Sequence, residues 1–301
     1  MSFLNPVNEP VLRFSSTDAD APQINYNART AGDVKAVLKA CLVTGYGATA
    51  SAGWSIVNEI DHVAEFVSPS AAMSDYRLGI DDTSASSTTW YYQYQDVRVN
   101  PVNNNQVRNF DSYANKSSPD NHWQLLVTAR GLVFIDFIAI TGVTGLVSRF
   151  TYWGAIKSAI TDTNTRNISY WCVGANAPVA TPPSIFNTSS TNTHHIVGAH
   201  SGLRFASTNI AALGGTSPIS ASNIELISDL FLENSQASLI GKQPAVMTRS
   251  SVAQSKLFDV TETTAGGRSL LNIAVVYLMS KSTTLDNYAK HLSIYTDYWE
   301  Y

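Results

Sequence analysis

The sequence has few charged residues. Lys, Arg, Asp and Glu make up 14 % of its 301 residues, as 19 basic and 23 acidic side chains, against roughly 25 % in an ordinary soluble domain. Without a basic excess, the composition excludes a nucleic-acid-binding protein that works by releasing counterions. Ser and Thr supply most of the polarity, and an aromatic content of 10 % excludes a disordered acidic chain.

Cysteine is also scarce, since Cys41 and Cys172 are the two in the chain. They are too few and too far apart for a disulfide framework or a zinc knuckle. Both lie in apolar segments, so we expect each to be a small buried side chain rather than a reactive thiol.

Long hydrophobic runs are missing as well. The best candidate for a membrane span, residues 131–147, is shorter than the ~20 residues that such a helix needs and contains Asp136. It is more typical of two buried strands with a turn at Gly142. The first residues lack the basic and apolar parts of a secretory signal. We therefore expect that the protein does not associate with a membrane. We also expect that it is synthesised in a cytoplasm.

One segment, residues 30–43, has the pattern of an amphipathic helix. Thr30 can cap its N-terminus, Asp33 can reach back to the free amides, and Gly45 and Gly47 can end it. The apolar residues that repeat with helical spacing are Val34, Val37, Leu38, Cys41 and Leu42. We expect the stripe, in particular Val37, Leu38 and Leu42, to be buried against a sheet.

Most other segments have the pattern of β-strands. Two of them, residues 123–129 and 132–140, are apolar on nearly both faces. We expect them at the centre of a packed sheet, joined by a tight turn at Arg130 and Gly131. The other expected strands are residues 75–80, 89–99 (with a bulge after Gln95), 150–156, 168–173, 224–232 and 270–279.

The density of strands predicts a mainly β fold, with β-sandwich or jelly-roll-like layers and one N-terminal amphipathic helix. Residues 174–193, rich in Pro, Asn, Ser and Thr, interrupt the series as a long loop or a boundary. The chain then divides into a β-rich domain with the helix, residues 1–175, and a β-rich part, residues 176–301. One continuous domain is the alternative.

Motifs for enzymatic chemistry are absent. The sequence has no phosphate-binding loop and no Gly-x-Ser-x-Gly elbow. His194, His195 and His200 could supply metal ligands, but adjacent residues on a strand point to opposite faces, so we favour ordinary histidines without a metal. We expect no cofactor.

Three groups of carboxylates are candidates for acid–base or cation-binding roles. Asp81 with Asp82, and Asp18 with Asp20, lie where Asp commonly satisfies turn amides, and we favour that role over catalysis. Asp136 lies in an apolar strand, so it needs a partner, for which Arg130 and Arg149 are the candidates. We therefore expect no catalytic residue.

Aromatic side chains are the remaining candidates for function. They can stack on sugars, but they are more often core residues or anchors of protein interfaces. The candidate interface aromatics are Trp90, Tyr92, Tyr94, Tyr295, Tyr298, Trp299 and Tyr301. We expect the last ten residues to pack on a neighbouring chain or on the subunit's own sheet.

Four segments together resemble a known family. They are residues 14–22 (FSSTDADAP), 36–47 (AVLKACLVTGYG) continuing to Trp54, 76–83 (YRLGIDDT), and 123–130 (WQLLVTAR) with 132–136 (LVFID). In this order and spacing they resemble a family of tailed-bacteriophage virion structural proteins, encoded among tail and neck genes. The likeness is clearest over residues 11–160.

The resemblance implies a structural component of the virion's tail, collar or baseplate, assembled in the host bacterial cytoplasm and without catalytic residues. Its partners would be other tail, neck or baseplate proteins and copies of itself, as a trimer, hexamer or dodecamer. A low charge suits such a subunit, because charged residues are depleted at the centres of interfaces. The alternatives are a receptor- or carbohydrate-binding tail protein and, third, a glycan-cleaving tail enzyme that uses Asp81, Asp82 or Asp136.

Overall fold

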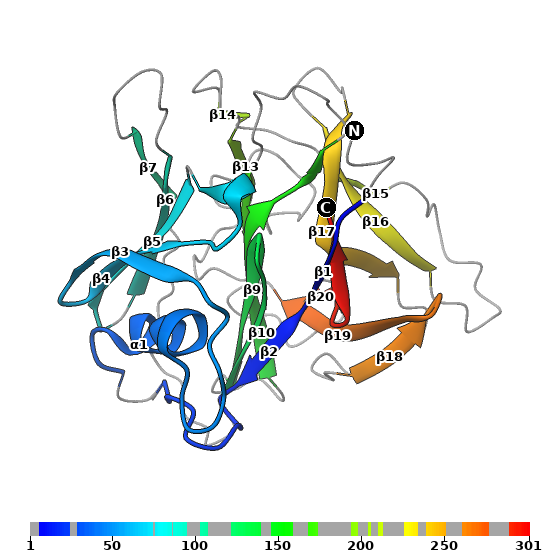
Figure 1. The fold of residues 1–301 in the computed structure, drawn as a ribbon. Helices are drawn as coiled ribbons and strands as arrows, with labels where there is room; N and C mark the ends of the chain where they lie inside the picture. The colour runs from blue at the N-terminus through cyan, green and yellow to red at the C-terminus, as the bar shows by residue number, and fades with distance from the viewer. Residues whose placement is uncertain are drawn as a thin grey trace, which may run out of the picture.

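The structure is a computed structural model. It describes residues 6–24, 29–74, 76–85, 87–94, 103–107, 122–139, 146–158, 168–173, 194–197, 204–205, 210–212, 226–233, 239–250, 261–276 and 289–301. Strands account for most of the described residues. The same residues include one α-helix (Figure 1). The predicted mainly β class is confirmed. In the described part of the chain, no helix is long and apolar enough to cross a membrane.

The N-terminal region forms an antiparallel five-stranded sheet with the helix against it. The strands follow one another in the order β3 (Ser55–Ile60), β4 (Val63–Val67), β5 (Tyr76–Ser84), β6 (Ser87–Tyr94) and β7 (Asn103–Val107). The helix, α1 (Asp33–Lys39), continues into a π-helical turn, η1 (Ala40–Thr44), and a short 3-10 helix, η2 (Ala71–Met73), joins β4 to β5. Consecutive strands thus pair as hairpins.

A larger sheet of fourteen strands contains the rest, apart from one pair. Its strands are β2 (Leu12–Ser15), β8 (His122–Thr128), β9 (Gly131–Ala139), β10 (Leu146–Ala155), β11 (Lys157–Ser158), β12 (Ile168–Val173), β13 (His194–Val197), β14 (Arg204–Phe205), β15 (Ile210–Ala212), β16 (Leu226–Glu233), β17 (Leu239–Ser250), β18 (Thr261–Ala265), β19 (Arg268–Val276) and β20 (Ala289–Tyr295). The pair is β1 (Asn8–Pro10) with β21 (Tyr298–Glu300), near the two ends of the chain. Strands from both sides of residue 175 share the large sheet, and the division into two domains stays a prediction.

Two hydrophobic cores lie on opposite sides of β8 and β9. Core 1 contains the helix stripe, the inner face of the five-stranded sheet, and Leu125 and Phe134. Core 2 contains Leu126 and Val133, the residues next to them, together with side chains of β19, β20 and the C-terminus. Because side chains alternate along a strand, both faces of β8 and β9 are buried. This confirms the expected central position of these strands and gives the fold its sandwich-like layers.

The start of the helix differs from the sequence prediction. α1 begins at Asp33 rather than Thr30, and Gly32, at a φ of 92°, occupies the N-cap position without a side-chain cap. The Asp33 carboxylate does reach back, accepting from the Thr30 amide at 2.9 Å and from the Thr30 hydroxyl at 2.6 Å. Thr30 as N-cap is therefore wrong. Gly45 ends the helical segment as predicted, with a φ of 76°.

The other strand predictions agree with the structure in position, with boundaries that differ by a few residues. For example, β5 continues to Ser84, past the expected end at Ile80, and β16 occupies most of the expected segment 224–232. The proposed bulge after Gln95, the turn at Gly142 and the segment 174–193 lie outside the described residues.

The apolar stripe of α1 is buried as predicted. Val37, Leu38 and Leu42 have no exposed surface and belong to core 1, which also contains Phe66 and Leu78 of the adjacent sheet. Leu38→Ala is expected to lower the free energy of unfolding by about 2–5 kcal/mol, because it leaves a cavity in a packed core. Urea denaturation measures this loss.

A matched control for this prediction is the next residue. The Lys39 side chain is well exposed and bonds the exposed carboxylate of Glu59, so Lys39→Ala is expected to cost no more than about 1 kcal/mol. A Leu38→Ala loss as small as that of Lys39→Ala would contradict the burial of the stripe.

Candidate functional site

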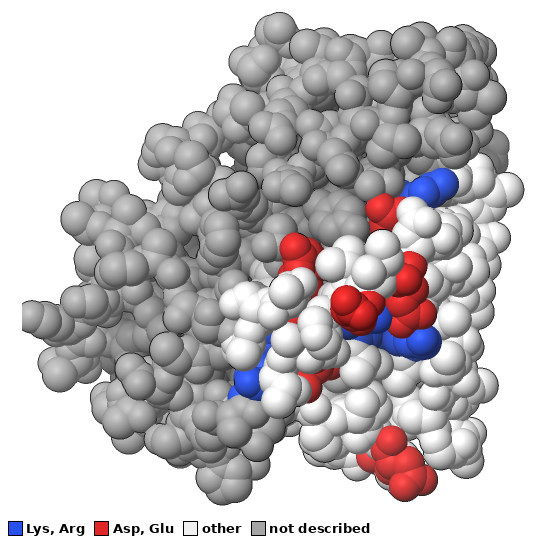
Figure 2. Space-filling view, turned by 90° about the vertical axis from the view of Figure 1, so that its left-hand side faces the viewer, with Lys and Arg blue, Asp and Glu red and all other residues white. Residues whose placement is uncertain are grey.

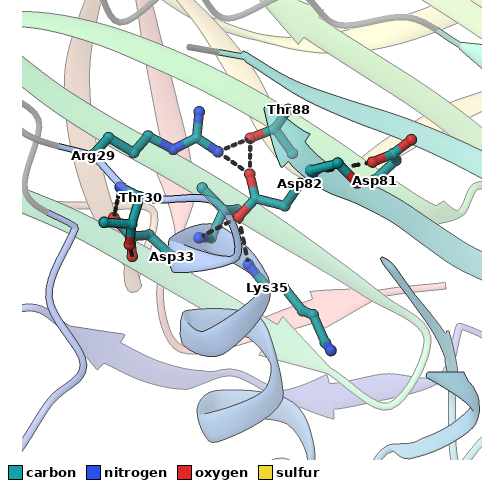
Figure 3. Close-up of polar contacts among 9 residues, drawn as sticks. Arg29, Thr30, Asp33, Lys35, Asp81, Asp82 and Thr88 are labelled. Atoms are coloured by element: carbon teal, nitrogen blue, oxygen red, sulfur yellow. Dashed lines mark hydrogen bonds and ion pairs between the residues drawn. The ribbon is translucent and has the colours of Figure 1, made fainter. Parts of the chain in front are cut away.

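The carboxylate of Asp82 is the centre of a buried polar network (Figure 3). Its Oδ1 accepts from the Arg29 guanidinium and, at 2.8 Å, from the Thr88 hydroxyl. Its Oδ2 accepts from the backbone amides of Val34 at 2.8 Å and Lys35 at 3.3 Å. Both oxygens of this fully buried carboxylate therefore have partners within the subunit.

These contacts make Asp82 the cap of α1. The two amides belong to the first turn of the helix, whose N–H groups have no partner within the helix itself. The negative charge also lies at the positive end of the helix dipole. A strand residue distant in sequence thus supplies the cap that the local sequence lacks.

Asp81 and Asp82 do not act together. Asp81 is exposed, and its carboxylate accepts from the Thr83 amide at 3.1 Å, as a turn aspartate does. Adjacent residues on a strand point to opposite faces, so the two carboxylates cannot share one ion or one substrate. The expected turn role describes Asp81, but it is wrong for Asp82, which lies within β5 and holds the helix.

Two ion pairs link the helix to β3. Glu59 on β3 bonds Lys35 at 2.8 Å and Lys39 at 2.9 Å, and these hydrogen bonds lower the pKa of Glu59. On the face shown in Figure 2, basic side chains lie among acidic ones, and most of the remaining described surface is uncharged. Such mutually paired charges offer no strong field to a charged ligand.

Asp18 and Asp20 also have structural roles. The Asp18 carboxylate accepts from the Ser15 amide at 2.8 Å and from the Tyr46 hydroxyl at 2.6 Å. Asp20 adopts a left-handed conformation, with a φ of 62°, in the turn that follows. These contacts are those of turn aspartates, and they tie the segment after β2 to Tyr46 at the edge of core 1.

Asp136 is buried on β9. Of its two expected partners, Arg149 is the residue directly paired with it on β10. Arg130 forms an ion pair with Glu9, with 2.7 Å between Nε and Oε1. The side chain of Arg149 is not among those that the structure describes, so Arg149 as the partner stays a prediction.

Little of the histidine and cysteine set falls on described side chains. His194 and His195 are successive residues of β13, and His200 lies outside the described residues. Among the described residues, no group of three His, Cys, Asp or Glu side chains could hold a metal ion. Cys41 is buried in core 1 as expected, and burial raises the pKa of its thiol. Cys172 lies on β12, and its side chain is not among those that the structure describes.

Three of the candidate interface aromatics lie on β6. Trp90, Tyr92 and Tyr94 pair directly with Ile80, Leu78 and Tyr76 of β5. These three β5 side chains are buried in core 1. The side chains at positions 90, 92 and 94 are not among those that the structure describes, so their interface role stays a prediction.

The C-terminal aromatics are mostly core residues. Trp299 and Tyr301 are 0 % and 2 % exposed, and with Tyr295 they belong to core 2. Side chains so buried offer a neighbour little surface, and an interface role for these three stays a prediction. The last ten residues were expected on a neighbouring chain or on the subunit's own sheet, and the structure shows the second, because β20 pairs with β17 and β19. Tyr298 alone of the four is partly exposed.

Tyr298 belongs to a clamp around Arg268 that the sequence did not indicate. The Arg268 guanidinium lies 3.5 Å from the ring centroid of Tyr298 and 3.9 Å from that of Tyr295. It also forms a two-point ion pair with Asp297, at 2.8 and 2.9 Å. The clamp fixes the turn between β20 and β21. The sequence does contain one part of the clamp, the Asp297 carboxylate between Tyr295 and Tyr298. It does not show that Arg268, on β19, is the cation that binds there.

The Asp297 carboxylate is expected to make stability depend on pH. Burial alone would raise its pKa, but the hydrogen bonds from Arg268 and two backbone amides hold it below the ordinary 3.8. A lowered folded-state pKa contributes stability above about 3.8, and this contribution is lost as the pH falls through the lower value. Asp297→Asn is therefore expected to lose less stability than the parent protein between about pH 5 and pH 2, as measured by urea denaturation.

A second cluster joins the N-terminal strand to the C-terminus. Arg130, in the β8–β9 turn, bonds Glu9 of β1 and lies over the ring of Tyr301, with its guanidinium carbon 5.3 Å from the centroid. The Tyr301 hydroxyl is 2.8 Å from that of Thr128. Sequence reasoning missed this cluster, because its members come from three separate parts of the chain.

The comparisons with known proteins add no relative. No protein-family model matches the sequence, and no curated protein matches it. The roles of these residues therefore have to be inferred from their own contacts, and those contacts are structural ones.

Proposed function

We propose that this protein is a structural subunit of a tailed-bacteriophage virion, in the tail, collar or baseplate, which acts by assembly with its own copies and with other virion proteins. It performs no chemistry of its own. Its location is the virion, after assembly in the host cytoplasm.

One observation carries the proposal. The four segments that resemble the virion family are far apart in sequence, and each contributes to core 1: examples are Phe14, Leu38, Tyr76 and Trp123. The resemblance therefore follows one packed unit rather than scattered residues. Two of their acidic residues, Asp18 and Asp82, have structural contacts: Asp18 accepts from the Tyr46 hydroxyl, and Asp82 accepts from the Val34 amide.

The low charge supports assembly. An ordinary soluble domain has roughly 25 % charged residues over its whole sequence, whereas this chain has 14 %. Several of its charges also neutralise each other in ion pairs, such as Arg77 with Glu65 and Lys157 with Glu300. Copies of such a surface repel each other weakly.

The purified full-length chain is expected to form a closed oligomer of three, six or twelve copies. Light scattering would give its mass and electron microscopy its symmetry, and antibodies against the chain would label particles of the phage that encodes it. A monomer at high concentration together with unlabelled particles would overturn the proposal.

The two alternatives are tested with the same preparation. A glycan array tests carbohydrate binding, and release of reducing sugar from host polysaccharide tests glycan cleavage. Specific binding or turnover would replace assembly alone as the function.

A further inference from the structure

The N-terminal arm, residues 6–11, is held differently from the other strands. Its strand β1 pairs with β21 as a separate two-stranded sheet, outside the two larger sheets (Figure 1). Backbone hydrogen bonds join Val7 to Tyr301 in both directions, at 2.9 and 3.0 Å, and the Val11 amide to the Asp297 carbonyl at 3.0 Å. The pair also contacts the body of the subunit, because Trp299 of β21 is buried in core 2 and Val11 packs against the same core. The Glu9 carboxylate adds a side-chain anchor for the arm.

The anchor is a binding site for the Glu9 side chain, formed by residues that also contact one another. Arg130, which bonds the Glu9 carboxylate, is itself fixed over Tyr301, and Tyr301 is fixed by Thr128. None of these three residues is a sequence neighbour of the arm. The site would therefore accept residues 6–11 of a second copy with the same contacts as those of its own chain.

The connection between the arm and the rest of the subunit is short, and an exposed apolar residue lies next to it. β1 ends at Pro10 and β2 begins at Leu12, so the arm leaves the body of the subunit at this point. Leu12 is 45 % exposed, one of few large apolar side chains so exposed among the described residues. With a connection this short, an exchanged arm would bring a neighbouring subunit close to β2 and cover Leu12.

We infer that the arm is exchanged between copies: residues 6–11 of one subunit occupy the place beside β21 of the next. The inference rests on the proposed assembly and specifies its contact. Exchange of an identical element costs little, because each subunit keeps the contacts that it has alone. Reciprocal exchange gives a dimer, and head-to-tail exchange closes a ring.

A disulfide between positions 8 and 300 tests the exchange. Val7 and Tyr301 exchange both backbone hydrogen bonds, so Asn8 and Glu300 form the neighbouring non-hydrogen-bonded pair, with Cα atoms about 4.5 Å apart. This distance suits a disulfide. The N8C/E300C protein would be oxidised and analysed on denaturing, non-reducing gels, next to each single cysteine variant and the parent protein, and its native mass would be measured by light scattering.

Three results can be distinguished. Loss of the one-chain band, with bands of two or more linked chains that only the double variant forms, supports exchange. An oligomer whose chains are each linked internally overturns exchange but leaves the proposed assembly intact. A monomer that is linked internally overturns both.

A pair of surface variants provides an independent test. Leu12→Glu places a charge where the exchanged arms would cross, and it is expected to shift the mass to that of a monomer. Val57→Glu changes a side chain that is also 45 % exposed, on β3 of the other sheet, and is expected to leave the oligomer unchanged. An unchanged oligomer with Leu12→Glu would count against exchange.

Discussion

Replacing Asp82 with alanine is expected to lower the free energy of unfolding by about 3–5 kcal/mol. Breaking a buried ion pair costs about this much because the remaining charge stays buried after it loses its oppositely charged partner. Here the remaining group is the Arg29 guanidinium, which is almost fully buried. The first-turn amides of α1, at Val34 and Lys35, lose their acceptor at the same time.

The neighbouring residue provides the control for this prediction. Asp81→Ala removes an exposed carboxylate whose described contact is the Thr83 amide, and it is expected to change stability by no more than about 1 kcal/mol. Urea denaturation of both variants, followed by circular dichroism, measures the difference. Equal losses for the two variants would show that Asp82 does not hold the helix.

The helix itself could be predicted from the sequence because its signals are local. The spacing of Val34, Leu38 and Leu42 and the terminal Gly45 all lie within one short segment. Its cap could not be predicted, because Asp82 approaches through the pairing of β4 and β5 and through the packing of α1 on β5. A capping pattern at Thr30 was present in the sequence, and the long-range contact replaced it.

The central strands were also accessible from the sequence. A strand that is apolar on both faces needs two cores, and β8 and β9 have one on each side. Which core a residue joins follows from the alternation of side chains: Leu125 and Leu126 are neighbours in sequence but belong to different cores.

The function of the aromatic residues could not be deduced from composition. A core and an interface both select large apolar rings, so Trp90 or Trp299 suits either from sequence alone. The structure shows Trp299 buried in its own subunit, whereas the side chain of Trp90 is not among those described. In the part of the chain that the structure describes, backbone edges and scattered residues such as Leu12 are candidates for assembly contacts, and a single sequence has no distinctive pattern for them.

Replacing Trp299 with alanine is expected to lower the free energy of unfolding by about 3–5 kcal/mol, the usual loss for a fully buried aromatic side chain. The Trp299 ring has no exposed surface and packs on Tyr152, with 6.1 Å between the ring centroids. Its Nε1 donates to the Tyr295 carbonyl at 2.9 Å. An anchor for a neighbouring subunit would behave differently, because its truncation would weaken the oligomer and leave the subunit stable.

Tyr298 is the matched control for that experiment, since it is the adjacent aromatic residue and is partly exposed. Tyr298→Ala removes one face of the Arg268 clamp, at an expected cost of about 1 kcal/mol. Both variants would be compared by urea denaturation and by native mass. A stable Trp299→Ala subunit that no longer assembles would assign Trp299 to the interface. A subunit that unfolds at lower urea than the Tyr298→Ala variant would show that the C-terminal aromatics hold β21 on core 2, and with it the strand on which the N-terminal arm lies.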